Sequence, residues 1–137
     1  MVRTSLLYPE LSYRLNGLAF ETHNALGRYR NEKQYGDHYE HLLQREGIRY
    51  VREYRASPSF ATERIGRNII DFLIEDAIVI EFKVATIITK DDYFQVQRYL
   101  HATNKELGII MNFRQKTIKP RRVLNGSMFR SHSEHSD

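Results

Sequence analysis

The stretch that decides the fold is "IIDFLIEDAIVIEFKV", residues 69–84, which is almost entirely apolar and yet carries charges inside it. Two runs rich in Ile, Leu, Val and Phe predict a pair of strands joined by a short turn. Asp71, Glu81 and Lys83 interrupt these strands at positions where a buried charge is costly. Either the strands are half exposed, or the three charged groups form a site that needs them.

The register of the two strands follows from their even-numbered residues, which are uniformly apolar and are expected to share one face. They are Ile70, Phe72, Ile74, Ile78, Ile80, Phe82 and Val84. A three-residue loop pairs Ile74 with Ile78 and keeps this set on one face, whereas a two-residue turn would separate it. In that register Asp71 lies opposite Glu81, and Lys83 lies one step along on the same side. Opposed side chains in an antiparallel pair have Cβ atoms about 4.5–5.5 Å apart.

Two opposed carboxylates repel each other, so the charges of Asp71 and Glu81 must be offset. A bound Mg²⁺ does this, since it is usually held by one or two carboxylates, and Lys83 does so in part. The alternative is a solvent-facing salt-bridge cluster at the base of the hairpin. Glu32 is a third candidate carboxylate, because it lies three residues before Tyr35 on the apolar side of a predicted helix. Its alternative role is a helix N-terminal charge stabilised by the macrodipole.

The rest of the chain predicts helices and strands that pack around this hairpin. Helices are expected between Pro9 and Gly27, over 31–47 with Asn31 and Gln34 as a capping box, and over 89–104 with Thr89 or Asp91 as the cap. Strands are expected over 48–56 at the periphery, over 107–113 in the core, and over 117–124 at an edge because of Pro120. Residues 1–125 are expected to form one domain, and 126–137 a polar, disordered tail.

Composition sets further bounds on function. The 137 residues include no Cys, which excludes disulfides, thiolate metal sites and a Cys nucleophile. No apolar run approaches the roughly 20 residues of a membrane span, and the N-terminus lacks a signal-peptide core, so a cytoplasmic location is expected. A net charge of +4 permits an anionic partner such as nucleic acid without requiring one.

The charged residues, taken in chain order, resemble a known pattern. Glu32, Asp71, the Glu81-Phe-Lys83 triplet and Gln95 are similar to the motif of the PD-(D/E)XK nuclease superfamily. The chain resembles still more closely the small bacterial proteins of the GxxExxY family, from about residue 10 to 124. Blocks with matching order and spacing carry this resemblance: "LNGLAFETHNALG", "NEKQY", "DFLIEDAIVIEFK", "QVQRYLHATN" and "LGIIMNF". The glycine of the family name is Tyr29 here.

The resemblance implies an α/β (α+β) fold with a restriction-endonuclease-like αβββαβ core, in which helices flank a central mixed sheet. It implies a nuclease in which Asp71, Glu81 and Glu32 hold Mg²⁺ or Mn²⁺ and a metal-activated water cleaves phosphodiester bonds. Lys83, Glu32 and Gln95 are the expected catalytic residues, whereas Tyr99 is expected to pack. The alternative is an inactive nucleic-acid- or protein-binding module on the same scaffold. Nucleic acid is the expected partner, with DNA or RNA and a homodimer left open, and no membrane is expected.

Overall fold

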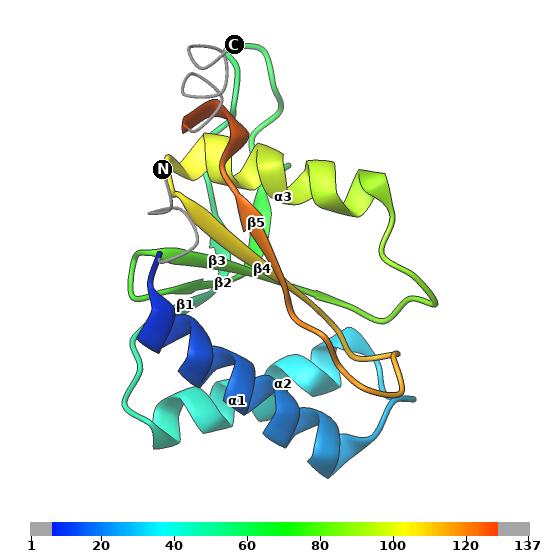
Figure 1. Cartoon of the computed structure of the whole chain (residues 1–137). Coiled ribbons are helices and arrows are strands. Elements are labelled where there is room, and N and C mark those ends of the chain that lie inside the picture. The colour runs from blue at the N-terminus through cyan, green and yellow to red at the C-terminus, as the bar shows by residue number, and fades with distance from the viewer. Residues whose placement is uncertain (1–6, 129–137) are drawn as a thin grey trace, which may run out of the picture.

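The computed structural model describes residues 7–128 and consists of three helices and a five-stranded sheet. The elements in chain order are α1 (Pro9–Leu26), α2 (Glu32–Arg45), β1 (Tyr50–Arg55), β2 (Ile69–Ile74), β3 (Ile78–Lys83), α3 (Lys90–Thr103), β4 (Leu107–Asn112) and β5 (Arg121–Leu124). The strands lie in sequence order, and only β3 and β4 run parallel. α1 and α2 pack on one face of the sheet and α3 on the other (Figure 1). The expected fold class is confirmed.

The helix boundaries follow from local chemistry. Asn31 and Gln34 form the expected capping box at the start of α2, in which each side chain accepts a hydrogen bond from the other residue's backbone N–H. Thr89 caps α3 in the same way, although its partner is Asp92. Gly27 ends α1 with φ +76° and ψ −158°, a conformation that side chains rarely adopt. The turn between α1 and α2, which brings Glu32 to the sheet, therefore needs a glycine at this position.

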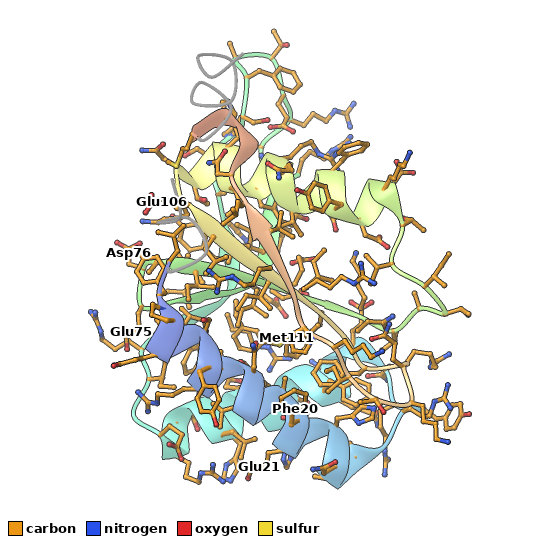
Figure 2. The ribbon with its side chains drawn as sticks, in the orientation of Figure 1. Phe20, Glu21, Glu75, Asp76, Glu106 and Met111 are labelled. Carbon is orange, nitrogen blue, oxygen red and sulfur yellow. The ribbon has the colours of Figure 1, made fainter. Side chains whose placement is uncertain are left out.

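The register of the β2–β3 hairpin is the expected one. Ile74 pairs with Ile78 across a three-residue loop, and Phe72 pairs with Ile80. β1 and β5 form the two edges of the sheet, as expected, and all six residues of β4 are buried in its interior. Figure 2 shows Met111 of β4 on the side that faces α1 and α2.

One expectation about the hairpin is wrong. The five apolar even-numbered residues from Phe72 to Phe82 pack in the core under α1 and α2, but Ile70 packs with Leu73 in the core under α3. The alternation of β2 therefore breaks between Ile70 and Phe72. Glu53, which the β1–β2 register places opposite Asp71, has φ +55° and interrupts the pleat at the same level. The irregularity lies directly beside the candidate site.

The expected tail and the expected domain boundary lie near or beyond the end of the described residues. Residues 126–128 form a helical turn after β5, while the remainder of the expected tail, 129–137, lies outside the described residues. The domain boundary at residue 125 stays a prediction. Among the helices within residues 7–128, none is both long enough and apolar enough to cross a membrane.

Candidate active site

Asp71 and Glu81 lie where β2 and β3 stop pairing. The ladder between the two backbones runs from Ile74 to Phe72 on β2, and beyond it the two carboxylates replace the backbone partners. The Asp71 N–H donates to Glu81 Oε1 at 3.0 Å, and the Phe82 N–H donates to Asp71 Oδ2 at 2.7 Å. Each carboxylate thus bridges to the opposite strand. The two acidic side chains meet at the open end of the hairpin, as the register predicts.

Burial makes this pair unfavourable when both groups are ionised. Glu81 is only 5% exposed. Burial raises the pKa of Glu81 well above its ordinary value, and the negative charge of Asp71 raises it further. Burial also raises the pKa of Asp71, although the Phe82 N–H and the charge of Lys83 oppose the shift. A shared proton or a bound cation would relieve the repulsion.

Lys83 is held in place by α3. Its Nζ donates to Gln95 Oε1 at 3.0 Å and lies 3.6 Å from Asp92 Oδ1. Burial alone would raise the pKa of Asp92, but the Thr89 N–H and the charge of Lys83 outweigh it, so the pKa is lowered. Asp92 therefore stays ionised beside the Lys83 ammonium. The N-terminal part of α3 fixes the position of this amine next to the carboxylate pair.

Glu32 reaches the site from the other face of the sheet. It is the first residue of α2 and lines a cleft of about 190 Å³ together with Asp71, Phe82 and Arg52. Burial raises the pKa of Glu32, the charge of Asp71 raises it further, and the charge of Lys83 lowers it. Glu32 and Asp71 thus line one cleft and influence each other, although 39 residues separate them in the sequence.

The prediction that Glu32, Asp71 and Glu81 hold one metal ion together requires these three carboxylates to lie close to one another. Over residues 7–128, no three acidic or histidine side chains lie close enough together to hold a metal ion as they stand. The structure brings together two pairs, Asp71 with Glu81 and Lys83 with Gln95, and places Glu32 across the cleft from Asp71. The assignment of these residues as ligands and catalysts stays a prediction.

The comparisons with known proteins agree with this geometry. A family model described as the PD-(D/E)XK nuclease superfamily matches residues 9–123. The chain belongs to this superfamily. Among solved structures it is similar to an alkaline exonuclease (LHK-Exo) from Laribacter hongkongensis, with a TM-score of 0.51 and 14% sequence identity. The match covers 89% of this chain and 74% of the exonuclease, and at this identity it shows a common fold. No curated protein matches the sequence significantly.

PD-(D/E)XK proteins generally use divalent metals, and the donor set present here fits such an ion. Asp71 and Glu81 supply only oxygen ligands, which Mg²⁺ and Mn²⁺ prefer. Mg²⁺ keeps several waters and is usually held by one or two carboxylates together with a substrate phosphate. The carboxylates of Asp71 and Glu81 would thus fit the protein's share of such a site.

The superfamily motif gives no sign of Arg52, which forms a wall of the same cleft. Its Nη1 lies 2.7 Å from Asp37 Oδ1 and 3.0 Å from Glu40 Oε1, so two carboxylates neutralise its charge. The guanidinium packs against Gly36, where any Cβ would overlap it, and lies over the Phe72 ring. Gly36 inside the predicted helix was a sequence signal for this contact, because a glycine within a helix usually allows another group to pack closely against it. Arg52 shapes the cleft and is not a free phosphate ligand.

Two further supporting residues were missed. Asp92 was detectable, because Thr89 and Asp92 have the spacing of a capping box at the start of α3. Asn112 is 1% exposed and pairs with Lys83 in the β3–β4 register. Its amide accepts from the Ala85 N–H at 3.1 Å and donates to the Ala85 carbonyl at 2.7 Å, which holds the chain that leaves the site. Nothing in the local sequence indicates that role. Tyr99 of α3 is buried in the core between this helix and the sheet, as expected of a packing residue.

Proposed function

We propose that this protein is a metal-dependent nuclease, in which Asp71 and Glu81 hold Mg²⁺ or Mn²⁺ and Lys83 acts on the attacking water or on the scissile phosphate. The observation that carries the proposal is the contact between the carboxylates of half-buried Asp71 and buried Glu81 at the open end of the hairpin, since a bound cation would relieve their mutual repulsion. A bound divalent ion would polarise a phosphoryl oxygen and lower the pKa of a coordinated water. Nucleic acid is the substrate class, with DNA or RNA left open.

The chain's own residues have separable roles in this proposal. Lys83 is an amine donor whose position is fixed by Gln95 and Asp92, so it can donate to a phosphate oxygen or to the attacking water without first being ordered. Gln95 accepts from Lys83 through its Oε1, so its amide nitrogen can donate to a phosphate oxygen or to the same water. Glu32 completes the polar lining of the cleft opposite Asp71.

The finer family assignment is also a proposal. The Glu-x-x-Tyr motif of the GxxExxY family corresponds to Glu32 and Tyr35. The Tyr35 hydroxyl donates to the Gly27 carbonyl at 2.6 Å and accepts from the Arg30 N–H at 3.3 Å. The tyrosine thereby fixes the turn that presents Glu32, which supports a paired role for the two residues. A cytoplasmic location and a homodimeric assembly stay predictions from the sequence.

The second candidate is an inactive binding module on the nuclease scaffold. It is favoured by the absence of a compact three-ligand cluster within residues 7–128. A panel of labelled single- and double-stranded DNA and RNA, incubated with Mg²⁺, Mn²⁺ or EDTA, separates the two candidates. We expect wild-type protein to cleave at least one substrate only with metal, and Glu81→Gln to cleave none. Binding without cleavage in every metal condition would instead support the inactive module.

A further inference from the structure

A groove without an assigned role runs along α3 and begins at the candidate active site. Its first part, about 380 Å³, is lined from α3 by Gln95, Arg98 and Tyr99, and from the loop 57–68 by Phe60, Arg64 and Arg67. Its second part, about 550 Å³, continues past Tyr93, Phe94, Gln97 and His101 toward Asn125. Phe60 and Arg98 line both parts, so the two cavities adjoin each other. We call it the α3 groove; Gln95, which holds Lys83, lies at its inner end.

The loop that forms one wall of the α3 groove is an ordered structure. Its ends meet through a hydrogen bond of 2.8 Å between the Ala56 N–H and the Asn68 carbonyl. Glu63 Oε1 accepts from the Ser59 N–H, the Ser59 hydroxyl and the Asn68 amide at 2.6, 3.0 and 2.9 Å. The loop rises past α3 in Figure 1. Because Glu63 faces these internal donors, its carboxylate serves to fold the loop.

Three arginines of the α3 groove have no carboxylate in ion-pair contact within residues 7–128, although the charge of Arg67 helps to lower the pKa of Glu63 in the same loop. Arg64, Arg67 and Arg98 are exposed, and within residues 7–128 none of their side chains forms a hydrogen bond or an ion pair. Other arginines behave differently: Arg45 and Arg52 are each held by two carboxylates. Unpaired guanidinium groups along a groove favour an anionic chain as its occupant.

Exposed aromatic rings line the same groove as these arginines. Phe60 is 59% exposed and Phe94 is 52% exposed, although both rings are apolar. Exposed rings beside guanidinium groups are the arrangement with which proteins bind single-stranded nucleic acid, because bases stack on the rings while phosphates contact the cations. The bases of a duplex already stack on each other and present only their edges in the grooves, so a duplex would leave these rings uncovered.

We propose that the α3 groove binds a single-stranded nucleic-acid segment that continues from the strand held at the candidate active site. Phe60 and Phe94 stack on its bases, and Arg64, Arg67 and Arg98 contact its phosphates. The position of the cleaved bond at Lys83 rests on the proposed nuclease function. Occupancy of the groove does not, because it can be measured as binding without cleavage.

The test is the affinity of wild type and variants for a fluorescent single-stranded oligonucleotide and for the duplex of the same sequence, in EDTA and at fixed salt. Phe60→Ala should weaken single-strand binding roughly 5- to 150-fold, the range of one lost base–aromatic stack, while Phe60→Tyr retains it. Duplex binding should change less than about twofold. The matched control is Phe20→Ala, since Phe20 is 44% exposed on α1 across the sheet and should leave both affinities unchanged (Figure 2).

The arginines are tested through the salt dependence of the same binding. Each phosphate contact contributes about −0.7 to the slope of log K against log salt for single strands, so Arg64→Ala combined with Arg67→Ala should reduce the slope by about 1.4. Arg14→Ala on α1 is the control and should leave the slope unchanged. Circular dichroism confirms that these surface variants fold. Equal losses of single-strand and duplex affinity, or no loss of either, would overturn the proposal.

Different experimental results would contradict the nuclease function and the α3 groove assignment. Wild-type protein that binds single strands through Phe60 but cleaves nothing with Mg²⁺ or Mn²⁺ would contradict the nuclease function and leave the α3 groove assignment intact. Wild-type protein that cleaves, while the Phe60 and arginine variants bind single strands as tightly as wild type, would contradict the groove assignment and leave the nuclease function intact.

Discussion

The two ends of the β2–β3 hairpin use the same residue types in opposite ways. At the turn end, Glu75 accepts hydrogen bonds from the Arg49 N–H and guanidinium, and Lys105 Nζ lies 3.1 Å from Asp76 Oδ1. Figure 2 shows Glu75 and Asp76 at the edge of the molecule. At the open end, the buried Glu81 lies beside the half-buried Asp71. The turn end has an opposite charge for each carboxylate, whereas the open end places two like charges together.

The pKa values follow this difference. The Arg49 N–H and side chain lower the pKa of Glu75, while burial raises the pKa of both Asp71 and Glu81. Charges at the turn end therefore stabilise the fold, and those at the open end destabilise it when ionised. A protein keeps an unfavourable charge pair where a ligand or a reaction uses it. Within one hairpin, the carboxylate with a structural role has a lowered pKa, whereas the carboxylates of the candidate site have raised pKa values.

The largest expected effect comes from removing one lysine at each end. Lys83→Met keeps the length of the side chain and deletes its charge, so turnover should fall about 10²–10⁴-fold, as for loss of a proton-transfer or charge-stabilising group. Nucleic-acid affinity should change little, because one contact among several is lost. Lys105→Met removes the turn-end lysine and should leave turnover unchanged. Single-turnover cleavage by both variants checks this, and wild-type turnover by folded Lys83→Met would exclude its catalytic role.

Metal binding should stabilise the fold through Asp71 and Glu81 at the open end of the hairpin, and not through the carboxylates at the turn end. At a Mn²⁺ concentration of about 100 Kd, the free energy of unfolding should rise by ~2.7 kcal/mol, because the ion binds the folded state alone. The melting temperature of wild type should rise accordingly, by roughly 10 °C for a domain of this size. Asp71→Asn should abolish the rise, and Glu75→Gln should retain it. Identical metal-induced shifts in both variants would place the ion elsewhere.

The pH dependence of stability should have opposite signs at the two ends. Because the folded-state pKa of Asp71 is raised, its contribution to stability is present at low pH and is lost as pH rises through that pKa. Asp71→Asn should therefore match wild type at low pH and become relatively more stable at neutral pH. The pKa of Glu75 is lowered, so Glu75→Gln should be relatively less stable at neutral pH and converge with wild type in acid. Urea unfolding of the metal-free proteins across this pH range tests both signs.

The features that the sequence predicted are those that local periodicity and short-range chemistry determine. The period of two and the three-residue loop define the register that joins Asp71 to Glu81, and the position of Glu32 on the apolar side of α2 brings it to the same cleft. Nothing local predicts that Ile70 faces α3, because the break in the pleat depends on the left-handed φ of Glu53 in the neighbouring strand.

The contacts between elements were the least predictable part of the site. Arg52 looked like an exposed residue of an edge strand, and its contact with Gly36 of α2 exists only after β1 and α2 have packed. The α3 groove likewise depends on how the irregular loop 57–68 lies against α3, which no periodicity specifies. Such features arise from tertiary packing of segments that are far apart in the chain.

Calorimetric titration of metal-free protein with Mn²⁺, in two buffers of different ionisation enthalpy, tests most directly whether the open end of the hairpin is a cation site. We predict that wild type binds Mn²⁺ and releases protons, because burial and mutual repulsion raise the pKa values of the two carboxyl groups. Glu81→Gln should lose most of the affinity and the proton release, while Glu75→Gln should retain both. Wild type that binds no Mn²⁺, or Glu81→Gln that binds it with the same affinity and proton release, would contradict the account.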